Sequence, residues 1–398
     1  MYKLLQINVS ANWGSTGKIA EQIGLHIMQQ GWESYIAYGR YSNYSKSHLI
    51  KIGKTADVYK HFLESKIFDN EGFASRRATK SLVNAIKKIQ PNIIQIHNIH
   101  DHYLNYPILF KYLNTLNIPI IWTQHDCWAY TGGCTYYNIK GCYCWQYGCN
   151  NCPRRKGFYF DKSSIHYNLK KEIFGSLKNL IIVSVSDWLS KEISLSFLSD
   201  KMIHTIPNGV DTNIFTPLSN SKIREKYNLG NNKILLGVAS VWHERKGLDD
   251  YLKLAKYLKN NEKIVLVGLN NKQSKNLPSN VIPIPRTENV NELVALYNEA
   301  IVVLNLSYEE TFGLTTVEGL SCGTPGIVYN CTASPELINE ETGRIVESGD
   351  INGVYNAITE LQSIGKENMT KACRQRAVDK YNKDVCFNSY VKLYKSLI

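Results

Sequence analysis

The sequence has no hydrophobic run as long as the roughly 18 residues that a membrane-spanning helix needs. It also has no internal repeat and no low-complexity segment. Residues 1–8 lead directly into a predicted strand, so the chain does not open on a signal peptide. These absences argue against an integral membrane protein, and they predict a soluble protein that stays in the cytoplasm.

Two motifs that bind nucleotide phosphates or their metal ions are also missing. Gly17 and Lys18 follow the first predicted strand as in a P-loop, but Asn12 replaces the first glycine of that motif. Ile19 stands where Ser or Thr would bind magnesium. No Asp-x-Asp motif stands at the end of a predicted strand. We therefore expect neither a P-loop NTPase nor a catalytic metal ion.

The composition is that of a soluble globular protein of two domains. The 398 residues are 43% hydrophobic and 20% charged, and this length suits two cores of about 200 residues each. The net charge of +12 favours anionic lipid surfaces, nucleic acid or phosphorylated substrates as partners.

Part of the positive charge lies in residues 51–90, which hold nine Lys or Arg and four Asp or Glu. Tyr59, Phe62, Phe68 and Phe73 are interleaved with these charges. The segment is either a solvated helical face with core aromatics, or a basic and aromatic surface that docks on a membrane carrying a lipid-linked acceptor.

Short apolar runs alternate with helical patterns along the chain. This rhythm predicts parallel sheets covered by helices, as in doubly wound α/β domains. It begins with a strand, a glycine-containing loop and a helix, and it starts again after residue 207. The predicted strands are residues 4–9, 34–38, 93–97, 120–123, 180–185, 233–239, 264–267 and 301–304.

The stretch after the strand at 301–304 is the most informative. It becomes helical near Gly313, and a helix N-terminus binds phosphate through its unpaired N–H groups and partial positive charge. Glu310 precedes this helix and Glu318 lies inside it, and carboxylates are good acceptors for sugar hydroxyls. The pattern predicts a nucleotide-sugar site; the alternative is an ordinary strand, turn and helix with two solvated carboxylates.

Polar side chains also end two strands of the first half. His97, His100 and Asp101 follow one strand, and His125 and Asp126 follow the next. Open α/β sheets bind ligands at these carboxyl ends, although a single histidine there is more often structural.

Residues 127–153 form a cysteine-rich loop that holds six of the ten cysteines. Disulfides are unlikely to form in a reducing cytoplasm, so this density indicates a metal site. The loop has no apolar periodicity, so it would need a crosslink, such as a bound metal ion, to become ordered. We expect structural zinc with four cysteine ligands, which leave no open position for catalysis, and the alternative is reduced thiols without metal. The predicted ligands are Cys134, Cys142, Cys149 and Cys152, with Cys144 in reserve.

The motifs resemble those of the retaining GT-B glycosyltransferases of family 4. The most specific is Glu-x-Phe-Gly-Leu-x-x-x-Glu at residues 310–318, followed by Cys-Gly-Thr-Pro at 322–325. Thr-x-His-Asp at 123–126 and Pro-Asn-Gly-Val-Asp at 207–211 also match. Many members that assemble bacterial polysaccharides, such as exopolysaccharide and colanic acid, have a similar cysteine-rich insertion. The resemblance covers essentially the whole chain.

The resemblance implies roles for the residues of the 310–318 motif. Glu310 would contact the donor sugar, and Glu318 would bind the ribose. The backbone amides of Gly313 and Leu314 would hold the phosphate. The same motif adds two further residues to the predicted donor site, Phe312 and Thr315.

Other implied roles lie outside this motif. Lys246, in a Lys-Gly pair, would neutralise the donor diphosphate. The family often has an arginine six residues earlier, where this chain has Ser240, and Arg245 would compensate. His125 would contact the donor sugar. The first glycine loop, near the donor phosphates or the acceptor, would contribute Gly14, Ser15 and Gly17. The acceptor side would be formed by His97, His100, Asp101 and Asp126.

The resemblance therefore implies two Rossmann-like domains that face a cleft. Residues 1–207 would bind the acceptor and residues 208–382 the nucleotide sugar, while residues 383–398 would form a helix that crosses back to the first domain. The enzyme would move a sugar from a nucleoside diphosphate to a glycan or a polyprenyl-diphosphate-linked acceptor of surface polysaccharide or lipopolysaccharide synthesis.

We expect an enzyme of this activity in the cytoplasm, where the inner face of the cell membrane would offer it a lipid-linked acceptor. Two alternatives remain. One is a sugar-nucleotide 2-epimerase of the same fold. The other is a non-catalytic zinc protein that binds nucleic acid through its positive charge; the glycosyltransferase interpretation itself predicts no nucleic-acid partner.

Overall fold

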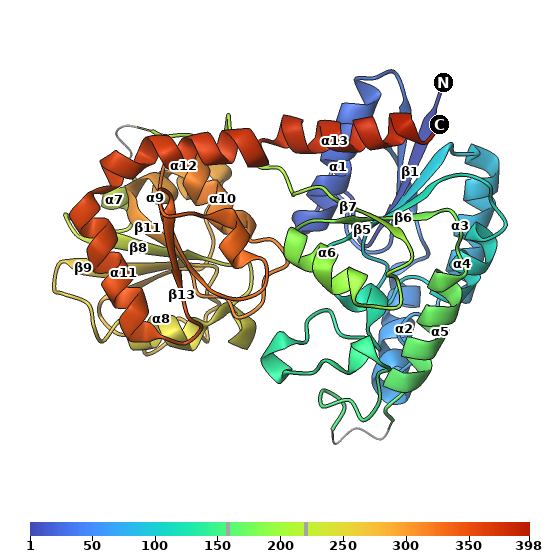
Figure 1. The fold of residues 1–398 in the computed structure, drawn as a ribbon, viewed down its shortest axis with the longest axis horizontal. Helices are drawn as coiled ribbons and strands as arrows, with labels where there is room; N and C mark the ends of the chain where they lie inside the picture. The colour runs from blue at the N-terminus through green and yellow to red at the C-terminus, as the bar shows by residue number, and fades with distance from the viewer. Residues whose placement is uncertain (157–159, 219–221) are drawn as a thin grey trace. The chain divides into compact units, whose positions relative to one another are not determined.

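The computed structural model describes residues 1–156, 160–218 and 222–398. The chain forms two compact units (Figure 1). Unit 1 consists of Met1–Ile206 together with Phe387–Ile398, and unit 2 consists of Pro207–Cys386. Each unit is built around its own parallel sheet, so the predicted α/β fold with two doubly wound domains is confirmed. No helix in the described ranges is long and apolar enough to cross a bilayer.

The sheet of unit 1 has the strand order β3-β2-β1-β4-β5-β6-β7, and its neighbouring strands are all parallel. The central strands are short apolar runs buried on both faces, as expected where helices cover both sides of a sheet. The strands are β1 (Lys3–Asn8), β2 (Glu33–Tyr38), β3 (His48–Lys51), β4 (Ile93–Ile96), β5 (Ile120–Gln124), β6 (Leu180–Ser184) and β7 (Met202–Thr205).

The helices of unit 1 cover this sheet and, with their flanking loops, connect its strands. They are α1 (Gly14–Met28), α2 (Thr55–Phe68), α3 (Arg76–Ile89), α4 (Tyr106–Leu113), α5 (Ser163–Gly175) and α6 (Asp187–Ser194). The cysteine-rich loop between β5 and α5 contains only short 3-10 turns within its described residues, η1 (Trp128–Tyr130), η2 (Asn138–Lys140) and η3 (Cys144–Gln146).

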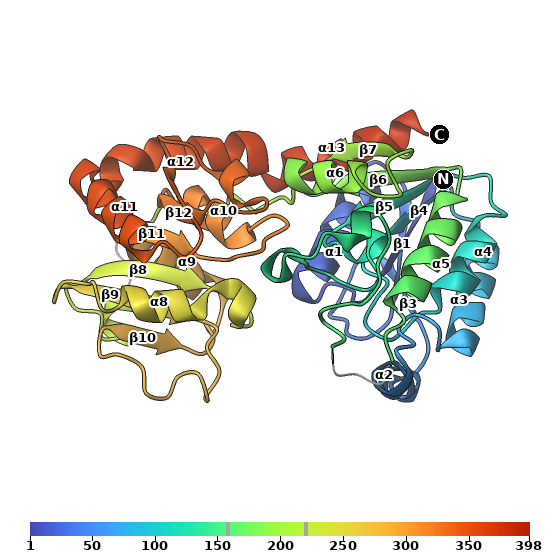
Figure 2. The same ribbon diagram turned by 60° about the horizontal axis from the view of Figure 1, so that its bottom comes forward.

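Unit 2 repeats the plan with the strand order β10-β9-β8-β11-β12-β13, and β8, β9 and β10 lie side by side in Figure 2. The strands are β8 (Lys233–Val238), β9 (Glu262–Val267), β10 (Val281–Ile284), β11 (Ala300–Asn305), β12 (Gly326–Tyr329) and β13 (Gly343–Val346). The helical segments are α7 (Ile223–Lys226), η4 (Glu244–Lys246), α8 (Leu248–Leu254), α9 (Val290–Glu299), α10 (Leu314–Ser321), η5 (Ser334–Leu337), α11 (Ile351–Ile364) and α12 (Lys366–Tyr381).

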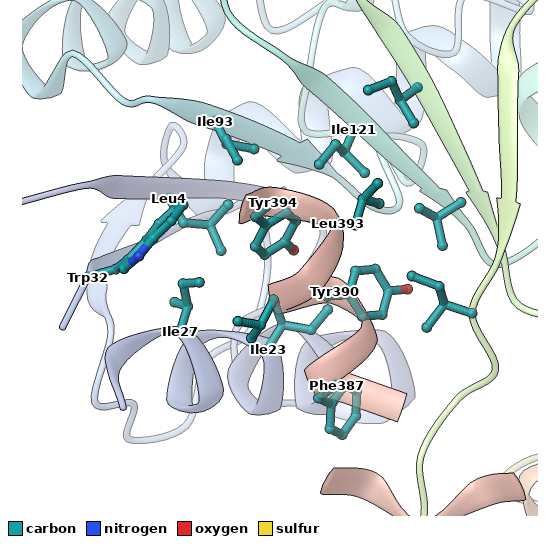
Figure 3. Close-up of a cluster of buried hydrophobic side chains, with 14 of the residues drawn as sticks. Leu4, Ile23, Ile27, Trp32, Ile93, Ile121, Phe387, Tyr390, Leu393 and Tyr394 are labelled. Carbon is teal, nitrogen blue, oxygen red and sulfur yellow. The ribbon is translucent and has the colours of Figure 1, made fainter. Parts of the chain in front are cut away.

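The last helix, α13 (Lys383–Ser396), completes the core of unit 1. Phe387, Tyr390 and Tyr394 are almost fully buried and pack in one cluster with apolar residues of α1 and of the sheet (Figure 3). Tyr394 also donates a hydrogen bond to the side chain of Gln95 in β4. The amphipathic pattern of the tail thus reflects packing against the first unit.

Each sheet has a point at which the strand order reverses, and loops diverge there at the carboxyl ends of two neighbouring strands. In unit 1 this point lies between β1 and β4, and in unit 2 it lies between β8 and β11. Ligands of open α/β sheets bind at such points. The fold therefore directs attention to the loops after these four strands.

Candidate active site

In unit 2 the reversal point carries a buried carboxylate between two cations. Lys246 ends the loop after β8, and Glu310 stands in the loop after β11. The Lys246 ammonium forms an ion pair and hydrogen bond with Oε1 of Glu310. Nη1 of Arg245 lies 3.9 Å from the other carboxylate oxygen, and it also donates to the carbonyl oxygen of Glu309 at 2.5 Å.

Two cationic side chains lie around the carboxylate of Glu310. The side chain of Glu310 is only 10% exposed. Burial opposes its ionisation, but Lys246 and Arg245 outweigh that effect and hold the pKa of Glu310 below its usual value. The carboxylate is therefore charged at neutral pH.

Two glycines allow these loops to approach one another. Gly247 has a φ of 67°, and a Cβ there would lie 2.0 Å from the carbonyl oxygen of Leu306. Gly313 has a φ of 102° and precedes α10, and a Cβ there would meet a methyl group of Leu337 at 2.9 Å. Side chains at either position would be strained, so the backbone requires glycine. This backbone brings the start of α10 to the site of Glu310.

The other predicted donor residues lie along α10 and have different surroundings. Leu314 and Thr315 are half-buried in its first turn. Glu318, one turn later, accepts a hydrogen bond from the hydroxyl of Tyr297 at 2.7 Å. The ring of Phe312 is buried against Tyr381 at a centroid distance of 5.7 Å. Phe312 therefore anchors the turn, and only its backbone is available to a ligand.

In unit 1 the loops after β4 and β5 bring two histidines together. Nδ1 of His97 lies 3.0 Å from Nε2 of His125, and Nε2 of His97 lies 3.0 Å from Oε1 of Gln6. Burial lowers the pKa of His97 well below its usual value, and it lowers that of His125 to about 4. Both imidazoles are neutral at pH 7. His97 is only 1% exposed, so it positions His125.

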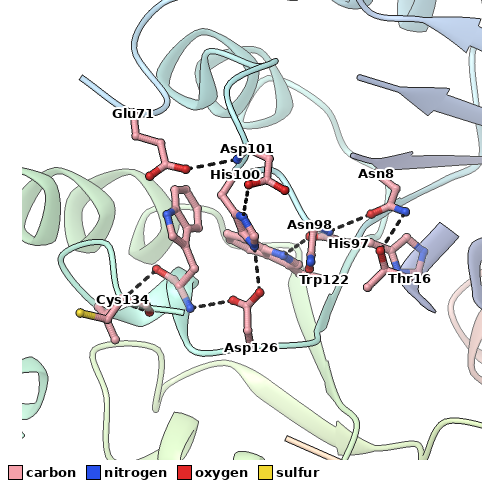
Figure 4. A network of polar contacts seen from close by, with 12 residues as sticks. Asn8, Thr16, Glu71, His97, Asn98, His100, Asp101, Trp122, Asp126 and Cys134 are labelled. Atoms are coloured by element: carbon pink, nitrogen blue, oxygen red, sulfur yellow. Dashed lines mark hydrogen bonds and ion pairs between the residues drawn. The ribbon is translucent and has the colours of Figure 1, made fainter. Parts of the chain in front are cut away.

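A second network beside this pair is charged (Figure 4). Nε2 of His100 lies 2.8 Å from a carboxylate oxygen of Asp126, and Nδ1 lies 3.8 Å from Asp101. Burial opposes the charge on His100, but Asp126 and Asp101 raise its pKa to about 10. Asp126 also accepts the backbone N–H of Trp128 at 2.9 Å. His100 is thus a half-buried imidazolium held between two carboxylates.

This network lines a cavity of about 430 Å³, which we call the polar pocket. Asp101 and His102, which also line it, have backbone φ angles of 78° and 66°. Residues other than glycine rarely adopt this backbone conformation. The amide of Asp101 is fixed by a 3.2 Å hydrogen bond to Glu71. The charged lining residues are Lys66, Glu71, His100, Asp101, Asp126 and Arg155.

The glycine loop after β1 has a mixed exposure. Gly14 and Ser15 are exposed in the first turn of α1. Gly17 is buried, and a Cβ there would meet Oγ of Ser10 at 2.7 Å. Gly17 therefore allows α1 to pack closely on its own loop, while Gly14 and Ser15 remain accessible.

The cysteine-rich loop surrounds a second cavity, of about 340 Å³, which we call the cysteine cavity. Five thiols line it, those of Cys134, Cys142, Cys144, Cys149 and Cys152. Cys127 is buried and is not among the lining residues. Across residues 1–156, 160–218 and 222–398, no three His, Cys, Asp or Glu side chains are grouped closely enough to hold a metal ion in this structure.

The sequence patterns identified part of these sites and missed the rest. The structure brings Glu310, Lys246 and Arg245 together from separate loops. Lys66, Glu71 and Arg155 of the polar pocket were not singled out, because they come from α2, the segment after it and the residues just after the cysteine-rich loop. The one signal for Lys66 and Glu71 was their place in the basic and aromatic segment 51–90.

Two protein-family models match consecutive parts of the chain. The one described as Glycosyltransferase Family 4 matches residues 17–214, and the one described as Glycosyl transferases group 1 matches residues 219–379. The chain belongs to the family 4 glycosyltransferases. The two family models correspond approximately to the two structural units. Glu310, Lys246 and Arg245 of unit 2 are therefore residues of a glycosyltransferase.

Known relatives resemble this glycosyltransferase over its full length. A protein assigned as the colanic acid biosynthesis glycosyl transferase WcaC of Escherichia coli K12 is 21% identical over 421 residues, which cover 99% of this chain and 100% of that protein. A glycosyltransferase structure from Rickettsia africae has a TM-score of 0.73 at 18% identity, covering 100% and 98% of the two chains. Anabaena HepE, solved with UDP-glucose, has a TM-score of 0.69 at 13% identity and covers both chains fully. The fold of the glycosyltransferase is GT-B.

Proposed function

We propose that this glycosyltransferase moves a sugar, with retention of configuration, from a nucleoside diphosphate to a hydroxyl of a lipid-linked precursor of surface polysaccharide or lipopolysaccharide. The observation that carries the proposal is the ion pair of Lys246 and Glu310 beside the start of α10. Two relatives support transfer from a nucleotide sugar: one is named for colanic acid biosynthesis, and the structure of another was solved with UDP-glucose.

The surroundings of Glu310 suit the departure of a diphosphate. In transfer, the acceptor oxygen bonds to the anomeric carbon, the bond to the diphosphate breaks, and the hydroxyl proton passes to the departing phosphate. Negative charge therefore develops on the diphosphate. Lys246, Arg245 and the N–H groups at the start of α10 are preorganised to stabilise that charge, and Glu310 would orient the sugar. Since no Asp-x-Asp motif is present in the sequence, we expect transfer without a metal ion.

The polar pocket is our candidate for the acceptor site. Its lining has three cationic groups, Lys66, Arg155 and His100, and three carboxylates, Glu71, Asp101 and Asp126. A net charge near zero with many donors and acceptors suits a neutral sugar, whose hydroxyls both donate and accept hydrogen bonds. Its volume of about 430 Å³ lies within the usual range of small-molecule sites.

The helix α2, beside this pocket, presents its apolar side outward. Phe62, Leu63 and Ile67 are between 40% and 58% exposed, whereas His61 and Ser65 on the same helix are buried. His61 is held by polar contacts: its Nε2 accepts the amide of Gly72 at 3.0 Å, and its Nδ1 lies 2.9 Å from Oγ of Ser75.

A helix that buries polar groups and exposes apolar ones needs an apolar partner. The exposed ring of Phe160 extends this surface, with its centroid 6.4 Å from that of Phe68. We propose that the surface rests on the inner face of the cell membrane, whose anionic lipids also attract the exposed Lys60 and Lys66. Because Ser65 and Lys66 line the polar pocket, a lipid-linked acceptor would reach it from the same surface.

The donor half of the proposal is tested by thermal unfolding of the full chain with UDP, GDP, ADP, CMP and their sugar conjugates. We expect one nucleoside diphosphate family to stabilise the protein, by about 2.7 kcal/mol at a concentration of 100 times Kd. Lys246→Met keeps the side-chain length and removes the charge, so it should lose most of this stabilisation. If no nucleotide raises the melting temperature of folded wild-type protein, the proposal is wrong.

Incubation with the nucleotide sugar alone tests the epimerase alternative. An epimerised nucleotide sugar would support the epimerase, whereas transfer that requires an added acceptor would support the proposed function.

The membrane half is tested by flotation with vesicles of neutral and anionic phospholipid. Replacing Phe62 and Ile67 together by Ser should lower the partition coefficient by at least about tenfold, because each fully inserted side chain contributes roughly 1.5–3 kcal/mol. Leu195→Ser is the matched control, since Leu195 is also half exposed but lies after α6. Equal binding by the double variant and the wild type would contradict the proposal, as would self-association of the chain without vesicle binding.

A further inference from the structure

The cysteine cavity brings together five thiols that the chain spreads over residues 134–152. Cys134 and Cys152 interact electrostatically, and so do Cys142 and Cys144. Cys149 lines the same cavity. The loop thus presents two thiol pairs and a fifth thiol around one space.

One backbone amide points at a sulfur of the cavity, and the turn after Cys152 is closed by a backbone hydrogen bond. The amide of Gly132 donates to Sγ of Cys149 at 3.2 Å, and the amide of Arg155 donates to the carbonyl oxygen of Cys152 at 2.8 Å. The loop approaches so closely that a Cβ on Gly132 would lie 2.9 Å from Cβ of Cys149 and 2.6 Å from a carbonyl oxygen of Ser163. Hydrogen bonds of this kind surround metal-bound thiolates.

A buried lysine stands next to the same thiols. Lys170 is only 1% exposed, and its ammonium donates to the carbonyl oxygens of Trp128 at 2.7 Å and Thr131 at 3.2 Å. It interacts electrostatically with Cys134 and Cys149. Lys170 also interacts with the carboxylates of Glu71 and Asp126, and four thiolates around one divalent cation would add further negative charge beside it.

We propose that the cysteine cavity binds one thiophilic divalent cation of the zinc class, and that this cation fixes the wall of the polar pocket. The predicted ligands are Cys134, Cys142, Cys149 and Cys152. The described thiols are not yet grouped around a centre, so we infer that binding draws the pair Cys134 and Cys152 and the other two thiols inward by rotation of their side chains. Four thiolates leave no open position, so the ion is structural.

The two cavities share part of their walls, which gives the metal site a consequence for function. Lys66, Gly133 and Arg155 line both. Arg155 follows Cys152 closely and is tied by an ion pair to the buried Asp69 at the end of α2. Holding Cys134 and Cys152 in place would hold Gly133 and Arg155 in place. This second part rests on the proposed acceptor role of the polar pocket.

The test measures metal in the purified full chain, prepared without chelators, by mass spectrometry and by zinc release with a thiol-blocking reagent. We expect one zinc ion per wild-type chain. Cys134→Ser, Cys149→Ser and Cys152→Ser should each weaken zinc binding by more than about tenfold in competition with a chelator. Cys331→Ser is the matched control, because Cys331 is also partly buried but lies in unit 2, and it should retain the metal.

Hydrogen exchange of the same samples tests the effect on the wall. Removal of zinc should increase exchange in peptides covering residues 131–155 and leave those of unit 2 unchanged. Wild-type protein that holds no zinc and takes up none on titration would overturn the proposal, as would cysteine variants that bind zinc like the wild type. Nucleotide-induced stabilisation, measured in parallel, is independent of this result, so a failure of the metal site and a failure of the donor site are distinguishable.

Discussion

Glu310→Gln is expected to lower kcat for sugar transfer by about 10²- to 10³-fold while the protein remains folded. The substitution keeps the shape of the side chain and removes the charge that orients Lys246 and the donor sugar. The backbone of Glu310 is held separately, because its amide donates to Thr332 at 2.9 Å and its carbonyl accepts the amide of Ala333 at 3.1 Å. The loss should therefore be one of chemistry and not of structure.

The measurement is initial-rate kinetics with the donor identified by thermal unfolding. Glu341→Gln is the matched control, since Glu341 is an exposed carboxylate of unit 2 outside the candidate site, and its kcat should equal that of the wild type. The Glu310→Gln protein should still be stabilised by the nucleoside diphosphate, because Lys246 and Arg245 remain. Wild-type kcat in this variant would exclude Glu310 from catalysis.

The second large effect is a loss of stability at alkaline pH through His100. Its folded pKa of about 10 lies above the ordinary histidine value of 6.5. The unfolded state therefore releases this proton first as pH rises. The stabilising contribution is complete below pH 6.5 and is lost as pH rises through about 10. We expect the free energy of unfolding to fall by a few kcal/mol across this interval.

Denaturant unfolding of the wild type and His100→Gln at several pH values between 6.5 and 10 checks this expectation. The variant should start less stable and should lose less stability over the interval, so the two curves should converge. The pKa of its partner Asp126 is lowered, mainly by His100 and against the effect of burial. The contribution of Asp126 to the free energy of unfolding is therefore lost only at acidic pH and does not change between pH 6.5 and 10. Parallel curves for the two proteins would mean that His100 is not protonated in the folded state.

Most central strands of both sheets could be predicted from the sequence, because they are apolar runs bounded by loops; the buried strand β12 was not predicted. β4 and β5 are examples, since every residue in each is buried. The strands at the sheet edges were missed because their patterns are weak. β3 is largely exposed, and β10 contains Pro283, which a central strand would not tolerate.

The site of unit 2 could be predicted because its residues form local motifs. Glu310 and Gly313 lie within four residues of one another, and Lys246 is followed by the glycine that its turn requires. The polar pocket could not be predicted in the same way. Glu71 and Arg155 are far apart in sequence, and only the tertiary structure brings them to one cavity. Periodicity cannot reveal such a site, since it reports only which face of an element is apolar.

α2 shows a further limit of sequence patterns. Its aromatic residues could belong to the core or to a surface, and the pattern of charges did not decide between them. The structure buries His61, whose two ring nitrogens both have partners, and leaves Phe62 exposed. Burial of a histidine is affordable here because neighbouring backbone and hydroxyl groups satisfy it. These partners, Gly72 and Ser75, lie outside α2, so the sequence of the helix alone could not predict that His61 is buried.

The place of α13 in the core of unit 1 has a consequence for the order of synthesis. Phe387, Tyr390 and Tyr394 fill the space between α1 and the first sheet, yet the ribosome adds them after the whole of unit 2. Domains that consist of one continuous segment can fold as they emerge, from the N-terminus onward. Unit 1 has to wait with an unfilled core while unit 2 is translated, so the unit made first is the one completed last.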